Sequence, residues 1–204
     1  MTQVFLSYRV DDEPFAAAFF DHELTREFGD DAVFFASRSI LLGADWEKAM
    51  FDAVSASDAV LVVIGPRWLM VTDPNGHRRL DDPLDFVRRE VELGLRLGKQ
   101  VIPVHLERRH RIDRAMLPET MRTLVDKQSA VVQFRNSKPD LARLVTRLRQ
   151  QIPGLGTAPV DRSRPAPGPP GNSYTTTIHG NVNGYVNQGK QIGGIFFGGT
   201  TSGG

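Results

Sequence analysis

Short apolar segments alternate with amphipathic segments along the chain as far as about residue 150. Five of the apolar segments have the length and composition of strands: residues 4–8, 32–36, 59–65, 100–106 and 130–134. The third and fourth are apolar nearly throughout, which is typical of strands covered by helices on both faces. This alternation predicts a doubly wound α/β domain with a five-stranded parallel sheet, and we expect the flavodoxin-like strand order.

The segments between the strands show helical periodicity. Asp11 or Asp12 is expected to cap the first helix, just before Pro14. Further helices are expected over residues 46–53, 84–97 and 118–125, and from Pro139 onward.

The helix expected over residues 84–97 carries a carboxylate among its apolar positions. At about 100° per residue, its other charged residues gather on one polar arc: Asp85, Arg88, Arg89, Glu92 and Arg96. Glu90 instead lies on the apolar arc, between Leu97 and Gly94. The residues alone leave two interpretations open. Glu90 is a catalytic group, or a carboxylate at the edge of the core paired with an arginine such as Arg9 or Arg38, and the two interpretations do not exclude each other.

The composition changes where the folded domain, residues 1–153, is expected to end. Residues 154–173 are rich in proline and glycine and have almost nothing to bury, which predicts a disordered linker. In residues 174–197, aliphatic and glycine positions alternate with polar ones, a pattern typical of cross-β assembly; a disordered Gly/Asn-rich segment is the alternative. Residues 198–204 are expected to be a disordered tail. The G-x-x-x-x-G-K spacing that ends at Lys190 is rejected as a phosphate-binding loop, because Gln191 follows it and no helix can form there.

The composition excludes several classes of function. The 204-residue chain has a net charge of +1, which gives no electrostatic case for a nucleic-acid partner. It has no cysteine, and its five histidines lack ligand spacing, so neither a thiolate nor a metal site is expected. No segment resembles a signal peptide or reaches the roughly 18 apolar residues of a membrane span. We therefore expect a cytoplasmic protein without a membrane partner.

Several motifs, in one order along the chain, resemble those of the Toll/interleukin-1 receptor (TIR) domain family. They are FLSYR at residues 5–9, RSILLGADW at 38–46, SDAVLVVI at 57–64, RRLDDP at 78–83, FVRRE at 86–90 and QVIPV at 100–104. The resemblance is to TIR domains of the bacterial NAD-cleaving type. In that type the glutamate of this helix is catalytic, which implies this role for Glu90, four residues after Phe86.

The resemblance also implies a binding site in which NAD+ is the substrate, so no cofactor is expected. The residues expected to bind it are Tyr8, Arg9, Arg38, Ile40, Gly43, Trp68 and Phe86. Tyr8 and Arg9 would lie at the carboxyl end of the first strand, where doubly wound folds place ligands, although Tyr8 is equally compatible with a core position. Trp68 is expected to be exposed and able to stack on a base, whereas Trp46 is expected in the core.

The function implied is that of an NAD+ nucleosidase that releases nicotinamide and ADP-ribose or a cyclic isomer, in a bacterial immune effector for antiphage defence or cell death. Residues 174–197 resemble bacterial amyloid signalling motifs, which implies self-association, together with the TIR domain, and an upstream sensor protein with a matching motif. The alternative is a noncatalytic TIR adaptor for homotypic signalling. In the adaptor the loop at residues 38–45 would mediate contacts and Glu90 would be structural.

Overall fold

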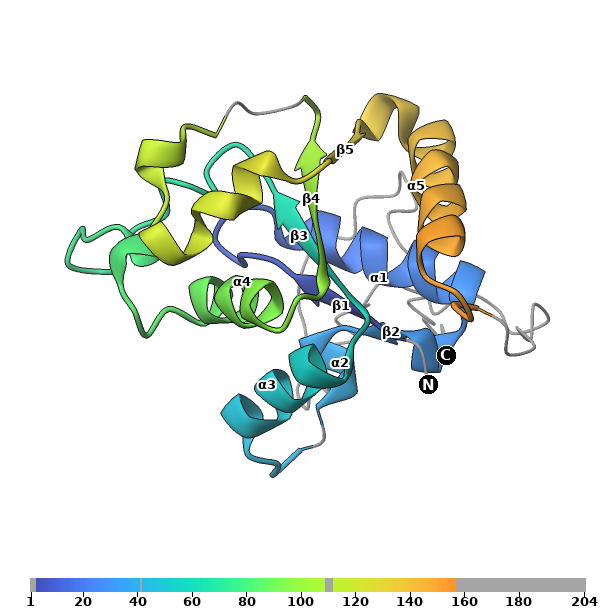
Figure 1. Cartoon of the computed structure of the whole chain (residues 1–204), viewed down its shortest axis with the longest axis horizontal. Helices are drawn as coiled ribbons and strands as arrows, with labels where there is room; N and C mark the ends of the chain where they lie inside the picture. Colours follow the sequence, from blue (N-terminus) through green and yellow to red (C-terminus); the bar gives the residue numbers. More distant parts are fainter. Residues whose placement is uncertain (1–2, 41, 109–111, 157–204) are drawn as a thin grey trace, which may run out of the picture. The chain divides into compact units, whose positions relative to one another are not determined.

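The computed structural model describes residues 3–40, 42–108 and 112–156. Five parallel strands form one sheet in the order β2-β1-β3-β4-β5 (Figure 1). They are β1 (Val4–Ser7), β2 (Val33–Phe34), β3 (Ala59–Ile64), β4 (Gln100–Leu106) and β5 (Ala130–Val132). The expected fold class and strand order are confirmed. The segment expected to assemble, residues 174–197, and nearly all of the expected linker lie outside the described residues.

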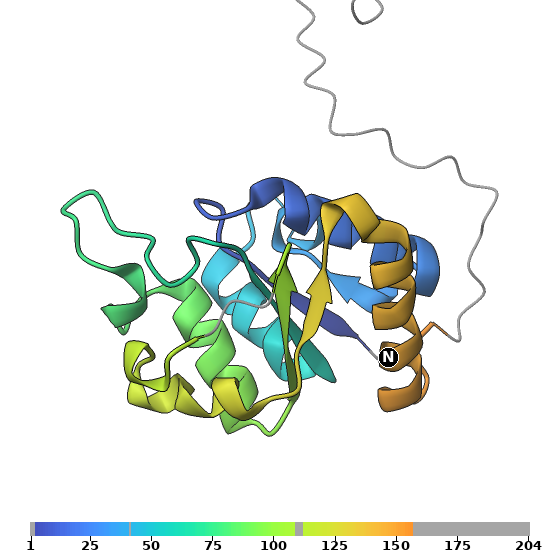
Figure 2. The ribbon, with the colours of Figure 1, turned by 90° about the horizontal axis from the view of Figure 1, so that it is seen from above.

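Helices cover both faces of this sheet (Figure 2). One face carries α1 (Pro14–Phe28) and α5 (Ser137–Gln151). The other carries α3 (Trp46–Ala56), α4 (Phe86–Arg96) and the 3-10 helix η4 (Glu119–Asp126). The shorter elements are α2 (Ala36–Ser39), η1 (Asp30–Ala32), η2 (Arg79–Asp81), η3 (Arg114–Met116) and η5 (Phe134–Asn136).

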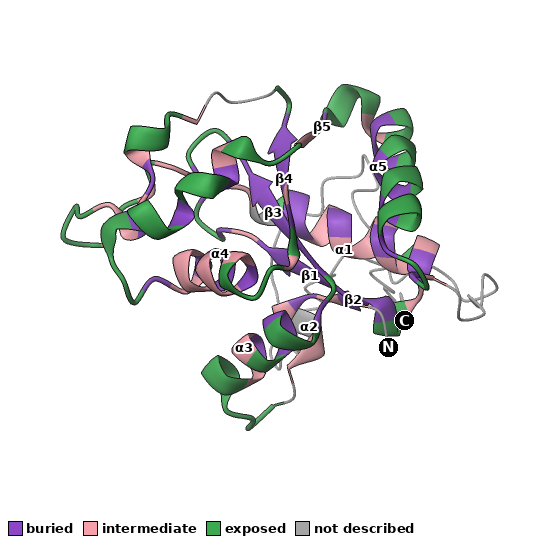
Figure 3. Cartoon of the chain, in the orientation of Figure 1, coloured by how far each residue is buried: buried purple, intermediate pink, exposed green. Residues whose placement is uncertain are grey.

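The position of each strand in the sheet explains its sequence pattern. All six residues of the central strand β3 are buried (Figure 3), as its continuous apolar run predicts. In β1, Val4 and Leu6 belong to the core on the α1/α5 face, whereas Phe5 belongs to the core on the α3/α4 face. Since successive side chains of a strand point to opposite faces, Ser7 shares the face of Phe5.

Two local expectations are wrong. Neither Asp11 nor Asp12 caps α1; the residue before the helix is Glu13, and no side chain caps this terminus. The buried carboxylate of Asp12 instead accepts hydrogen bonds from the backbone N–H groups of Gly65 at 2.8 Å and Arg67 at 2.9 Å. It therefore joins the loop after β1 to the loop after β3. The second strand is shorter than expected, because η1 precedes it and α2 follows it closely.

Helix α4 lies unusually close to the sheet at one position. Its buried residues are Val87, Glu90, Val91 and Gly94, at helical spacing on one face. A Cβ atom added to Gly94 would lie 3.1 Å from Cγ2 of Val60 and 3.2 Å from Cγ2 of Val101. The missing side chain of Gly94 therefore permits the close approach of α4 to β3 and β4, and this approach sets the depth of Glu90.

We predict that Gly94→Leu lowers the free energy of unfolding by about 2 kcal/mol, because the added side chain overpacks this interface. The intrinsic helix propensity of leucine acts in the opposite direction by up to about 1 kcal/mol, so the sign of the change identifies the dominant effect. Urea denaturation measures it, with Arg96→Leu at an exposed position of the same helix as the control. A Gly94→Leu protein that is more stable than wild type would contradict the close approach.

Candidate functional site

Glu90 extends from the buried face of α4 to the end of β1. The residue is only 5% exposed, and its Oε2 atom accepts a hydrogen bond from Oγ of Ser7 at 2.5 Å. Ser7 is itself 1% exposed. The other buried residues on this face of α4 are apolar or glycine, so the carboxyl group lies in an environment of low polarity. Its burial agrees with its place on the apolar arc of the sequence.

Burial raises the pKa of Glu90 from 4.5 to about 8. The largest cause is desolvation, which disfavours the charged form. The hydrogen bond from Ser7 lowers the pKa, the negative charge of Asp85 raises it, and the positive charge of Arg9 lowers it. In the free protein at neutral pH, the Glu90 carboxyl group is therefore mostly protonated.

The positive charge nearest to this strand end, Arg9, pairs with Asp85 and not with Glu90. Nη2 and Nη1 of Arg9 donate to the two carboxylate oxygens of Asp85 at 2.7 and 2.9 Å, and both residues are buried. Asp85 also caps α4 by accepting the backbone N–H of Arg88 at 2.9 Å, and Nε of Arg79 donates to it at 3.1 Å. These four hydrogen bonds fix the first turn of α4 against the end of β1.

The other polar and loop residues expected to bind substrate lie at different depths. Tyr8 packs against the core on the α1/α5 face, with its ring 5.2 Å from that of Phe35, and so lies on the face opposite Glu90. Ile40 packs against the core on the α3/α4 face. Gly43 is exposed with φ of +83°, a backbone conformation that favours glycine. Arg38 belongs to α2, and its side chain lies outside the described residues.

The expected exposures of the two tryptophans are wrong. Trp68, expected to be exposed, is 0% exposed and belongs to the core on the α3/α4 face. The Asp12 carboxylate holds the start of its loop, and the Trp68 ring packs inward with the guanidinium of Arg9 5.8 Å from its centroid. Trp46, expected in the core, is 43% exposed. The exposed tryptophan of this face is therefore Trp46.

An aromatic cluster connects α3 to α4 one turn before Glu90. The ring of Trp46 meets that of Phe86 edge to face at 4.5 Å, and Phe51 stacks on Phe86 at 6.5 Å. The guanidinium of Arg89 covers Phe51 at 4.3 Å, and its Nη2 donates to Oε1 of Glu47 at 2.6 Å. Phe86, expected in the site, thus lies beside Glu90 on the helix surface.

Sequence reasoning missed two of the residues that surround Glu90. Ser7 follows three apolar residues in β1, and the period-two alternation of the strand could have placed it on the inner face. Asp85 directly precedes the helix, which is the position of a capping residue. Its pairing with Arg9, 76 residues away in sequence, has no local signal.

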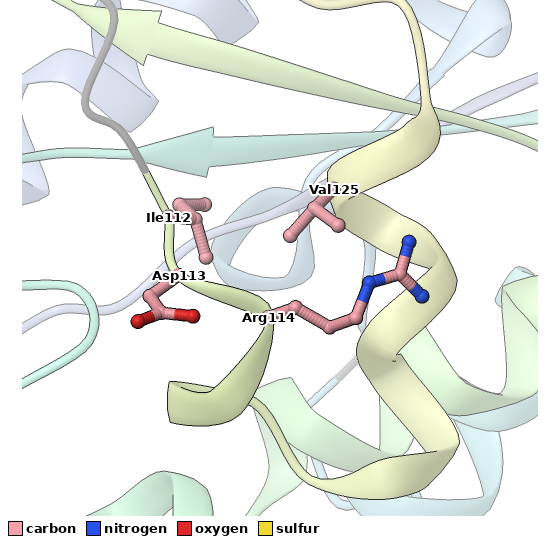
Figure 4. Close-up of a pocket in the computed structure, with 4 residues that line it drawn as sticks. All are labelled: Ile112, Asp113, Arg114 and Val125. Carbon is pink, nitrogen blue, oxygen red and sulfur yellow. The ribbon is translucent and has the colours of Figure 1, made fainter.

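A surface hollow of about 420 Å³ lies elsewhere on the molecule and is lined by Ile112, Asp113, Arg114 and Val125 (Figure 4). Glu90 does not line it, and Arg114 forms an ion pair with Asp126, so we do not assign it as the active site. Among the described residues, no group of three His, Cys, Asp or Glu could hold a metal ion. None of the helices in the same residues is long and apolar enough to cross a membrane.

We predict that the stability difference between Glu90→Gln and wild type depends on pH. Because the pKa of Glu90 is about 8 in the folded protein and near 4.5 in the unfolded chain, the wild type loses stability as the pH rises between these values. The loss amounts to roughly 3 kcal/mol at pH 7 and is complete above pH 8. Glutamine has no charge to desolvate, so Glu90→Gln should gain stability relative to wild type over this interval.

Urea denaturation at several pH values between 5 and 9 checks this expectation. Glu92→Gln is the control, because the Glu92 carboxylate is accessible and accepts hydrogen bonds from Arg88 and Thr120. A Glu90→Gln difference that is the same at pH 5 and pH 9 would show that Glu90 is not desolvated in the folded protein.

A family model described as TIR domain matches residues 4–148. No curated protein sequence matches. Similar solved structures include the TIR domains of the activated Roq1 resistosome recognising the pathogen effector XopQ. They are 14% identical, with a TM-score of 0.50, and the match covers 74% of this chain and 99% of that one.

Two further similar structures come from animals. The TIR domain of the Toll-related receptor TRR-2 from Hydra magnipapillata is 16% identical, with 74% of this chain and 97% of that one covered and a TM-score of 0.44. A TIR-STING receptor from C. gigas is 17% identical, with 70% and 38% covered and a TM-score of 0.43. The structural similarities concern the fold, whereas the family model spans most of the chain. This protein belongs to the TIR domain family.

Proposed function

We propose that this TIR domain is an NAD+ nucleosidase with Glu90 as its catalytic residue, and that the protein is a bacterial immune effector. The observation that carries the proposal is the buried carboxyl group of Glu90, which shares the buried face of α4 with Val87, Val91 and Gly94 and is hydrogen-bonded to Ser7. A pKa raised to about 8 by desolvation is typical of functional carboxyl groups, because burial of a charge is otherwise unfavourable.

One carboxylate is sufficient for this reaction. When the bond between nicotinamide nitrogen and ribose C1′ breaks, both bonding electrons leave with the pyridinium nitrogen, so nicotinamide departs neutral without an acid to protonate it. Positive charge develops on the ribosyl group, and a carboxylate stabilises it more strongly in a site of low polarity than in water. Water then bonds to the ribosyl centre and loses a proton to the solvent, which gives ADP-ribose, or the adenine ring bonds to it, which gives a cyclic isomer.

The positive charge of the substrate favours the ionised form of Glu90, which the reaction requires. Glu90 is mostly neutral in the free protein at neutral pH, whereas the reaction requires its carboxylate. NAD+ carries a positive charge on its pyridinium ring, and a nearby positive charge lowers the pKa of a carboxyl group. Binding of the cationic ring therefore favours release of the Glu90 proton. The value of kcat/KM, which reports the ionisation of the free enzyme, should rise as the pH approaches 8.

The alternative of a noncatalytic adaptor has its own support in the structure. Leu42 and Trp46 expose apolar surface in and directly after the loop at residues 38–45, which would suit contacts with another domain. In an adaptor the buried Glu90 would only shape the packing of α4. Measurement of NAD+ cleavage distinguishes these two functions.

Assembly is proposed as the activating step. The support is the sequence pattern of residues 174–197, in which one aliphatic phase includes Val182 and Val186. Stacked copies of this segment, recruited by a sensor protein with a matching motif, would raise the local concentration of TIR domains through a proline-rich linker. NAD+ and further copies of the chain are thus the proposed partners.

We predict that Glu90→Gln lowers the rate of nicotinamide release by about 100- to 1000-fold, because it removes the charge that stabilises the ribosyl group. Chromatographic quantification of nicotinamide from NAD+ at high protein concentration measures the rate. Glu92→Gln, two residues away on the accessible side of α4, should retain near-normal activity. Near-normal turnover by a folded Glu90→Gln protein would refute the catalytic assignment of Glu90, whereas a wild-type protein that releases no nicotinamide would favour the adaptor.

We predict that Val182→Asp abolishes both fibril formation and assembly-dependent NAD+ loss, since a charge buried in each stacked copy is repeated about every 4.7 Å. Thioflavin binding and fibre diffraction of the 174–197 peptide, beside NAD+ consumption by the full chain, test this. Ser202→Asp in the full chain, outside the motif, is the control. Wild-type peptide that stays monomeric at high concentration, even with seeds, would contradict the assembly proposal.

A further inference from the structure

The hydroxyl group of Ser7 is the polar group in direct contact with the Glu90 carboxyl. Its Oγ lies 2.5 Å from Oε2 of Glu90 and donates to it, and both side chains are buried. Within the described part of the chain, this is the one side-chain hydrogen bond that the structure gives Glu90. A second carboxylate oxygen, Oε1, is therefore left for another partner.

Ser7 occupies a position at which an apolar residue would be expected. It ends the strand sequence Val-Phe-Leu-Ser, pairs in register with Val62 of β3, and is almost completely shielded from solvent. A buried hydroxyl group is unfavourable unless it forms a hydrogen bond, and here its partner is Glu90. Packing of the core therefore does not explain a serine at position 7, whereas its hydrogen bond to the Glu90 carboxyl group does.

A hydroxyl group suits a partner that changes its protonation state. It can donate to a carboxylate or rotate and accept from a carboxylic acid, so the contact persists when the Glu90 proton is lost. A lysine or arginine in its place can only donate, and a methyl group can do neither. Ser7 can thus keep the same Glu90 oxygen in place in the resting and in the ionised state.

We propose that Ser7 is a positioning residue for NAD+ cleavage: its hydroxyl holds one oxygen of Glu90 so that the other is directed to the substrate. This inference rests on the proposed function of Glu90. It does not make Ser7 a nucleophile, since the hydroxyl serves the carboxylate and forms no bond to the ribosyl group.

The charged groups around Glu90 form hydrogen bonds with one another, with Nε of Arg9 left without a partner, and Ser7 is the group hydrogen-bonded to Glu90 in the described structure. At the start of α4, Asp85 accepts hydrogen bonds from Arg9 and Arg79. Arg89 donates to Glu47 of α3. Glu92 accepts hydrogen bonds from Arg88 and from Thr120 of η4. On β4, His105 is buried and shares by alternation the face of Val101, and β3 presents Val60 and Val62. Of these, Asp85 and Arg9 act on Glu90 electrostatically, with opposite signs.

The test compares Ser7→Ala and Ser7→Thr with a matched control, Ser57→Ala, in the full chain. Ser57 is also completely buried, but its hydroxyl donates to the backbone oxygen of Ala53 at 2.7 Å, within α3 and the turn that follows it. Two readouts are needed. One is the titration of the Glu90 carboxyl carbon by NMR, assigned with Glu90→Gln, and the other is the pH profile of kcat and KM for nicotinamide release.

Ser7→Ala should shift the Glu90 midpoint upward by about one pH unit, because the ionised form loses its donor. It should lower kcat/KM at pH 7 by about 10-fold through the smaller ionised fraction of the free enzyme. A further loss of several-fold should remain after extrapolation to full ionisation, which reports the lost orientation. Ser7→Thr retains the hydroxyl and should restore the midpoint and most of kcat/KM, whereas Ser57→Ala should leave both at wild-type values.

A folded Ser7→Ala protein with an unchanged Glu90 midpoint and unchanged kcat/KM would overturn the proposal. The same holds if Ser57→Ala produced equal shifts, since these would then report general loosening. If Ser7→Ala does not fold, Ser7→Cys keeps the shape of the side chain, in a slightly larger form, with a much weaker donor and is expected to give the same shifts. If wild type releases no nicotinamide, the proposed function fails, and the positioning role in that reaction falls with it. The NMR midpoints then still show separately whether Ser7 holds the carboxyl group.

Discussion

The removal of one carboxyl group from water is the constraint on which this structure depends. Glu90 lies in the interface between α4 and the sheet, at a position of the helix where its neighbours are Val87, Val91 and Gly94. Burial of an ionised carboxylate there is unfavourable, so the group holds its proton to a pKa of about 8. The charged form of this group is therefore unfavourable without a positive partner, and the cationic ring of NAD+, the proposed substrate, would be such a partner.

Other residues near the carboxyl ends of the strands fix the position of Glu90. Gly94 lets α4 approach the sheet. Asp85 accepts four hydrogen bonds, from Arg9, Arg79 and the backbone N–H of Arg88, and these fix the first turn of α4. Both terminal nitrogens of Arg9 donate to Asp85, so Arg9 orients α4, while its buried Nε atom has no hydrogen-bond partner in the described structure. Asp12 joins the loops after β1 and β3 in the same region.

The parts that could be predicted from the sequence are those with a local periodic signal. The five strands follow from apolar runs, and the burial of Glu90 follows from the helical arc, because both depend on the geometry of a single element. The exposures of Trp46 and Trp68 could not be predicted, because they depend on contacts between segments far apart in sequence, such as the Asp12 bonds to the loop of Trp68. Asp85 lies on the polar arc of the helix, which predicts an exposed side chain. Its pairing with Arg9, a residue far away in the sequence, buries it instead.

The ionisation of Glu90 in the presence of ligand tests the central claim most directly. The carboxyl carbon of Glu90 is titrated by NMR in the free protein, with NADH, and with a non-cleavable analogue of NAD+ that retains the pyridinium ring. The two ligands differ in the charge of the nicotinamide ring. We predict a midpoint near 8 in the free protein, a fall of at least one unit with the cationic analogue, and no such fall with NADH. A midpoint near 4.5 in the free protein, or equal responses to both ligands, would contradict the account.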